Sequence, residues 1–326
     1  MILPYMLRLL CLCFASFFLI HTVLGLAVWA LASGAIRAGR AVRPRTGARF
    51  LLVLRLLPVT LAAFVVMGLC IPSYLWLEPN AQTERVGLAC CVMALLGALT
   101  CGISLIRTGR ALRISLAHGR RCEREGRLQG VGGHTLPVTI LNSCAPVLAL
   151  TGVIRPRVVV SRGVVEGLPP EELSAALDHE RAHHESRDNL KRLLLFLAPE
   201  VFPFCRTFAR LDSSWSAIAE WSADDEATGG DSRRSLSLAA ALVRLAQMGT
   251  APEMSPLASL LVTNDRELSA RVDRLLGFAP VPENPPRNMR ALLRAGAVTI
   301  TCAAIAVIIH PGTLYSVHRL LETLIR

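Results

Sequence analysis

Four apolar stretches constrain this chain more than any other feature of its sequence. Each has roughly the 20 mostly apolar residues that cross a bilayer as a helix, and they cover about 9–33, 50–77, 86–106 and 291–310. Hydrophobic residues make up 52% of the 326 residues, which is more than a soluble domain usually carries. Arg55 and Arg294 lie near the ends of their stretches, from which a long side chain can reach the membrane interface. The sequence therefore predicts a membrane protein with four spanning helices.

The first stretch has a competing interpretation as a signal peptide, because Arg8 precedes it and Ala30-Leu31-Ala32 resembles a cleavage site. An apolar run of about 24 residues is longer than the ~7–15 residues of a signal-peptide core. We therefore favour a retained helix.

The distribution of arginine predicts which side of the membrane each loop faces. Residues 37–49 carry five arginines and no acid, residues 78–84 carry two acids and no base, and residues 107–127 carry seven arginines. Because positive loops stay on the cytoplasmic side, residues 37–49 and 107–290 are expected there. The N-terminus and the short tail 311–326 are expected outside the cell membrane.

Charge and cysteine usage exclude other classes. The net charge is +11, but no run of basic residues alternates with aromatic ones, so we do not expect direct nucleic-acid binding. The ten cysteines lie mostly in the apolar stretches and none forms a CxxC pair. Neither a disulfide framework nor a cysteine zinc site is indicated.

Residues 107–290 are long enough to form one domain with a core of its own. Val, Ile and Thr punctuated by Gly and Pro predict three strands, at about 137–141, 146–151 and 156–161. Residues 168–200 predict one continuous helix, with Pro170 in its first turn. Further helices are expected at about 208–227, 234–248 and 265–276. The fold class predicted is a multi-pass α-helical membrane protein with a cytoplasmic α+β domain.

The stretch DHERAHHESRDN (178–189) contains the spacing H-E-x-x-H, formed by His179, Glu180 and His183. Residues four apart share one face of a helix, so both imidazoles can bind one metal ion. Neutral imidazole suits Zn²⁺, which makes a bound water acidic enough to act near neutral pH. Glu180 lies beside the metal and can take a proton from that water. The competing interpretation is a charged surface helix whose histidines fall four apart by chance.

A catalytic zinc ion needs a third protein ligand, and the helix IAEWSADDEA (218–227) offers one. We assign Glu220 as this ligand, because it lies 37 residues beyond His183, enough to end one helix and begin another. Asp224 shares the face of Glu220 and can accept a hydrogen bond from a ligating imidazole. Asp188 can do the same from the first helix. By itself the Glu220–Asp224 pair would be an exposed acidic face.

These motifs resemble a known family. HERAHHESRDNL is similar to the H-E-x-x-H-x-x-x-R-x-D signature of BlaR/MecR-type membrane metallopeptidases. LTGVIRPRVVVSRGV, AEWSADDEA and ELSARVDRLLG resemble, in turn, that family's strand segment, third-ligand helix and helix before the last span. The resemblance implies a zincin-like domain and a zinc endopeptidase of the gluzincin type. It also implies that His179, His183 and Glu220 bind Zn²⁺ and that Glu180 is the catalytic base.

Two features depart from the family. Position 219 is Ala, where a charged residue is usual, and only about 16 residues follow the fourth stretch. Relatives that sense β-lactams carry a penicillin-binding domain there, so a β-lactam receptor of that construction is not expected. Any activating signal would enter through the spans, the lipid or another protein.

The leading hypothesis is a membrane zinc endopeptidase that cleaves a cytoplasmic protein, such as a transcriptional repressor, or itself. A substrate peptide would add in extended form to residues 145–151, our candidate edge strand. One alternative is an HtpX/CAAX-type protease of quality control or processing. Another is a non-catalytic scaffold or signal transducer with a structural or vestigial metal site. The sequence does not determine the oligomeric state.

Overall fold

The computed structural model describes residues 4–77, 86–129, 138–200, 206–249, 259–260 and 265–277, with isolated positions between 312 and 323. The fourth expected span, 291–310, and the tail 311–326 lie outside these continuous ranges.

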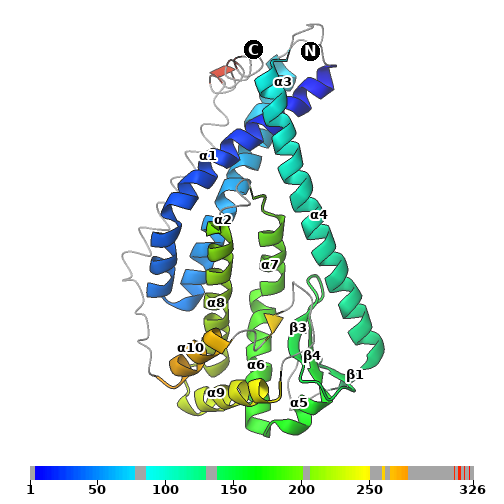
Figure 1. Cartoon of the computed structure of the whole chain (residues 1–326), viewed down its shortest axis with the longest axis vertical. Helices are drawn as coiled ribbons and strands as arrows, with labels where there is room; N and C mark the ends of the chain where they lie inside the picture. Colours follow the sequence, from blue (N-terminus) through cyan, green and yellow to red (C-terminus); the bar gives the residue numbers. More distant parts are fainter. Residues whose placement is uncertain are drawn as a thin grey trace.

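Three helical segments near the N-terminus are long and apolar enough to cross a bilayer. α1 covers Tyr5–Ala41, α2 (Pro44–Val65) continues through a π-helical turn (Val66–Cys70) into α3 (Ile71–Leu77), and α4 covers Leu88–Glu125. At 1.5 Å per residue, α1 and α4 are each about 55 Å long, whereas the hydrocarbon core of a bilayer is roughly 30 Å thick. These helices therefore extend beyond the apolar layer, and α4 runs from the top of the molecule down to the sheet (Figure 1).

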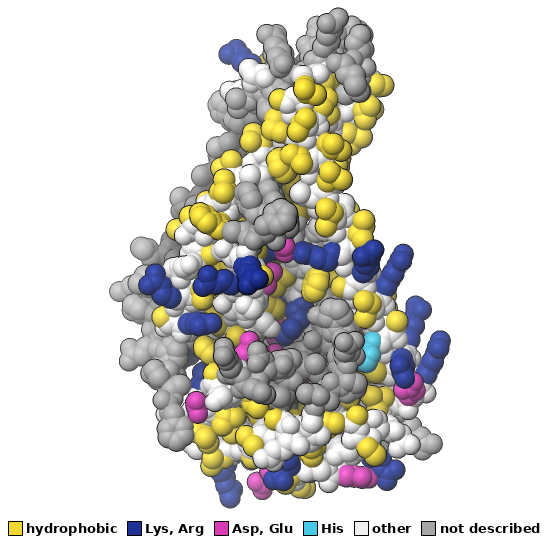
Figure 2. All heavy atoms as spheres, viewed as in Figure 1, with side chains coloured by type: hydrophobic (Ala, Val, Ile, Leu, Met, Phe, Trp, Pro, Cys, Tyr) yellow, Lys and Arg dark blue, Asp and Glu magenta, His cyan; other side chains and the backbone are white. Residues whose placement is uncertain are grey.

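The distribution of side-chain types on the surface agrees with this arrangement. Figure 2 shows hydrophobic side chains over the upper part of the molecule, and Lys and Arg side chains gathered across its middle. Such a basic belt is typical of helices where they leave a membrane. The predicted fold class, long apolar helices joined to an α+β domain, is confirmed.

The α+β part begins with a mixed sheet of five short strands. They are β1 (Gly126–Gln129), β2 (Val138–Leu141), β3 (Leu148–Thr151), β4 (Arg157–Ser161) and β5 (Ser259–Leu260). Their order in the sheet is β1-β2-β4-β3-β5; β2 and β4 are parallel, and the other neighbours are antiparallel. β2, β3 and β4 lie where the Val-, Ile- and Thr-rich pattern predicts strands.

Six helices complete the described part of this domain. They are α5 (Arg162–Gly167), α6 (Pro170–Ser186), α7 (Asp188–Leu197), α8 (Thr207–Thr228), α9 (Ser232–Gln247) and α10 (Asp265–Leu275). Acidic Glu171 and Glu172 lie in the first turn of α6, where they favour the positive end of the helix dipole.

The prediction of one continuous helix through 168–200 is wrong at a single residue. Arg187 has φ 54° and ψ 43°, the left-handed conformation that ends a helix, so α6 stops at Ser186 and α7 starts at Asp188. The change of direction brings the Asp188 carboxylate back to His183 of the preceding helix. That contact compensates for a non-glycine residue in this conformation.

α6 is buried between the sheet and α9. Leu150 and Val160 of the sheet form one core cluster with Leu177 of α6 and with Leu242 and Leu245 of α9. α8 packs against α6 on one side and against α2 and α1 on the other. The domain is therefore built directly onto the apolar helices (Figure 1).

Arg55 lies inside this junction and does not reach a membrane interface. Its side chain is 2% exposed; Nε donates to Asp212 at 3.0 Å and Nη2 lies 3.5 Å from Glu200. Arg107 of α4 also binds Glu200, at 2.9 Å. Our expectation for Arg55 is wrong, because the α+β domain supplies carboxylates that a sequence window around Arg55 does not contain.

α4 also holds the end of α7. Ser104 and Arg107 donate hydrogen bonds to the backbone carbonyl groups of Phe196, Leu197 and Ala198. The last carbonyl groups of a helix have no partner within the helix, so α4 satisfies the C-terminal end of α7.

Replacing Arg55 by Leu should destabilise the protein strongly, because Asp212 loses the buried cation that binds it, while Glu200 keeps Arg107. We expect the free energy of unfolding to fall by about 3 kcal/mol, read as a lower Tm of the detergent-purified protein. Arg45→Leu is the control: its pair with Glu226 has side chains 65% and 54% exposed, and its loss should cost less than about 1 kcal/mol. Equal shifts in Tm for the two variants would contradict a structural role for the buried pair.

Candidate metal centre

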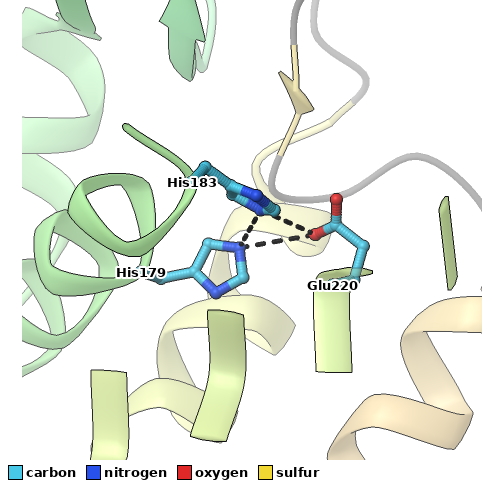
Figure 3. A group of neighbouring side chains, drawn as sticks. All are labelled: His179, His183 and Glu220. Carbon is cyan, nitrogen blue, oxygen red and sulfur yellow. Dashed lines mark hydrogen bonds and ion pairs between the residues drawn. The ribbon is translucent and has the colours of Figure 1, made fainter. Parts of the chain in front are cut away.

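Two histidines and a glutamate converge from α6 and α8 (Figure 3). His179 Nε2 and His183 Nε2 lie 3.1 Å apart, and each lies 3.4 Å from Oε2 of Glu220. Both histidines are 0% exposed and Glu220 is 7% exposed. Among the described residues this is the group of three whose donor atoms could hold one metal ion.

The other nitrogen of each imidazole faces a carboxylate. His183 Nδ1 donates to Asp188 at 2.7 Å, and His179 Nδ1 lies 3.0 Å from Asp224. Carboxylates in these positions fix the tautomer and direct both Nε2 lone pairs to a common point. The structure thus brings together every residue that the sequence suggests for the site, the two aspartates included.

Glu180 lies beside this group and is also completely buried. Neither of its carboxylate oxygens has a hydrogen-bond partner in the described part of the chain. Burial raises the pKa of Glu180, while His179 and His183 act in the opposite direction. A buried carboxyl group without a partner is costly, so this position is suited to a polar group that enters the site.

Charges within the cluster balance one another. Burial by itself lowers the pKa of His183, but the carboxylates of Glu220 and Asp188 raise it to about 10. Burial raises the pKa of Glu220, yet His183 and His179, followed by Arg271, hold it well below its usual value. A divalent cation would replace the proton that His183 otherwise holds.

Arg271 of α10 is a residue that sequence reasoning missed. It is 4% exposed and donates to both oxygens of Asp224, at 2.6 and 2.9 Å, while Nη1 lies 3.2 Å from Oε2 of Glu220. Its position on α10 could have indicated a buried site, because it shares a helix face with Leu268, Val272 and Leu275, which pack into the core. An arginine on an apolar helix face needs a buried acid.

The donor set fits Zn²⁺. Two neutral imidazoles and one carboxylate, each oriented by a further group, form a usual catalytic zinc set that leaves a coordination position open. The unpartnered Glu180 carboxylate adjoins that set. His179, His183 and Glu220 would hold the ion.

The donor set is one that a metallopeptidase centre can use, and the comparison with protein families points to the same class. Residues 148–270 match the model of peptidase family M48. The match starts at β3, includes α6 and α8 with all three donor residues, and ends next to Arg271. It indicates a hydrolase domain of the metallopeptidase class over the α+β part of the chain. No curated protein matches the chain.

β3 does not form the free edge expected of residues 145–151. It pairs with β4 on one side, and on the other side β5 pairs Ala149 with Leu260 and Leu150 with Ser259. Asn189, next to Asp188, donates to the carbonyl groups of Leu150 and Gly152 and so ties β3 to α7. The expectation fails because a distant segment of the same chain occupies the outer side of the strand.

Arg271→Gln should weaken metal binding about 10- to 100-fold, because Asp224 loses the cation that holds it against His179. The zinc dissociation constant of the full-length protein, measured by competition with a chromogenic chelator, checks this. Arg274→Gln is the matched control on the same helix, since its partner Asp225 has a side chain 49% exposed. If Arg271→Gln bound zinc as tightly as this control, Arg271 would have no part in the site.

Proposed function

We propose that the protein is a zinc-dependent endopeptidase embedded in the cell membrane, of the BlaR/MecR type, with its peptidase domain in the cytoplasm. One observation carries the proposal: a buried Glu180 carboxylate without a partner adjoins the His179–His183–Glu220 cluster, inside the segment that matches a peptidase family. A purely structural metal site has no need of such a carboxylate. The non-catalytic scaffold is therefore the weaker interpretation.

The residues divide the work of peptide hydrolysis. When bound, the zinc ion supplies Lewis-acid chemistry and lowers the pKa of a water molecule. Glu180 takes the proton of the attacking water and passes it to the leaving amine, as a general base and then a general acid. Asp188 and Asp224 hold the imidazoles in the orientation that the ligand set requires.

The basic belt supports the proposed orientation in the membrane. Five arginines in 37–49 and seven in 107–127 follow the first and third apolar stretches in the sequence, and positive loops stay in the cytoplasm. The proposed substrate is accordingly a cytoplasmic protein, for example a transcriptional repressor, or the chain itself.

Zinc analysis of the detergent-purified protein tests the function directly. We expect about one zinc per chain, its loss in His183→Ala and Glu220→Ala, and its retention in Glu180→Gln. Cleavage of a casein substrate by Glu180→Gln should fall about 10²- to 10⁴-fold, because only proton transfer is removed.

His184→Ala provides the control, since His184 is adjacent in sequence but lies outside the cluster. It should keep both zinc and activity. If the parent protein binds no zinc after metal is supplied, the zinc endopeptidase hypothesis is refuted. The non-catalytic scaffold then remains as the interpretation.

Self-cleavage has its own test. Zinc-loaded wild-type protein should accumulate a break in its own chain, detected by mass spectrometry of the intact protein, whereas Glu180→Gln should stay whole. A break that forms equally in both proteins would instead come from a contaminating protease.

A further inference from the structure

Cysteine thiols gather at one end of the apolar helices. One apolar cluster joins the beginnings of α1 and α4 to the π-helical turn and α3, which lie together at the top of Figure 1. Its cysteines are Cys11, Cys13, Cys70, Cys90 and Cys91. Thiols from segments far apart in the sequence are thereby brought together, and we call this group the thiol cluster.

Within the thiol cluster, Cys11 of α1 contacts two thiols of α4. Its side chain is hydrogen-bonded to those of Cys90 and Cys91. Cys90 and Cys91 are adjacent in the first turn of α4, and adjacent residues of a helix do not face each other. Cys11 is therefore the thiol with which either of the other two can pair.

Close packing of α1 against α4 holds these thiols in place. A Cβ atom added to Gly97 of α4 would collide with the backbone carbonyl oxygen of Phe14 in α1, so the two backbones approach each other about one to two turns beyond the thiols. Glycine permits such an approach between membrane helices. Thiols that already contact each other need mainly side-chain rotation to reach the ~2.05 Å of a disulfide bond.

The arrangement suits a disulfide better than a metal ion. In the described part of the chain, the group of three donors at the spacing that one ion requires is the candidate metal centre, and the thiol cluster does not supply a second one. Cys11 and Cys91 are partly exposed, whereas Cys90 is buried. An external oxidant can therefore reach Cys11 and Cys91.

We propose that Cys11 and Cys91 are a redox-active pair whose disulfide fastens α1 to α4. The oxidant is an external disulfide, either a small molecule or a thiol oxidoreductase in its disulfide form. The Cys11 thiolate attacks it and releases one thiol, and the Cys91 thiolate then displaces the second thiol from the Cys11 sulfur. Two protein thiols are oxidised, the external disulfide is reduced to two thiols, and those thiols take up the two protons.

The proposed orientation in the membrane puts this pair on the oxidising side. Cys11 and Cys91 lie close to the beginnings of α1 and α4, at the end of the helices that we expect outside the cytoplasm, where disulfides persist. Further along α1, Val28 and Ala32 share a core cluster with Leu211 of α8. The disulfide would therefore tie α4 to the helix that carries α8.

Equilibration of the detergent-purified full-length protein with reduced and oxidised glutathione tests the pair. After the remaining thiols are trapped with N-ethylmaleimide, mass spectrometry of the intact chain should show one disulfide in the wild type under oxidising conditions. Cys11→Ser and Cys91→Ser should lack it, and Cys90→Ser should keep it. Cys101→Ser is the control and should match the wild type, because Cys101 lies about three turns further along α4.

Two results would overturn the pairing: a wild-type protein that stays reduced in oxidised glutathione, or a disulfide that forms in Cys91→Ser at the same glutathione ratio as in the wild type. The disulfide should also raise the Tm of the wild type, because a cross-link restricts the unfolded chain. An equal Tm before and after oxidation would contradict the fastening of α1 to α4. These measurements involve neither zinc nor peptide cleavage, so their outcome is independent of the proposed function.

Discussion

A buried carboxylate is stabilised by a cation close to it, and this constraint organises the described helices around α8. Asp212, Glu220 and Asp224 lie on one face of that helix, and each takes its partners from a different part of the sequence. Arg55 comes from the second apolar helix, His179 and His183 come from α6, and Arg271 comes from α10. Because an uncompensated buried charge costs several kcal/mol, these elements are bound to α8 in one arrangement. The His179–His183–Glu220 cluster is the middle part of a longer row of charge pairs.

The sequence predicts whatever depends on local spacing. Four-residue intervals within α6 and within α8 place His179 near His183 and Glu220 near Asp224, because helical geometry alone brings such pairs together. The apolar stretches are equally local, since length and composition suffice to indicate a helix that crosses a bilayer.

Contacts between distant segments were not predictable in this way. Arg271 and Arg192 both reach the His179–His183–Glu220 cluster, but their contacts join residues that lie 47 and 28 positions apart in the sequence, and no periodicity encodes them. The occupied side of β3 has the same cause, because the two residues of β5 carry no strand signal of their own. The left-handed conformation of Arg187 could not be predicted from residue propensity either. The hydrogen bond between His183 and Asp188, which the turn brings together, stabilises that turn. Arg55 shows the same limit, since its partners belong to another domain.

α7 is held at both ends, and this has a mechanical consequence. Its first residue, Asp188, accepts a hydrogen bond from the imidazole of His183, and its last carbonyl groups accept hydrogen bonds from Ser104 and Arg107 of α4. A ten-residue helix is a rod about 15 Å long that resists compression. Any sliding of α4 along its own axis is therefore carried by α7 to His183 without passing through the sheet or the loops. The ten-residue α7 is therefore the short rigid link between the apolar helix α4 and His183.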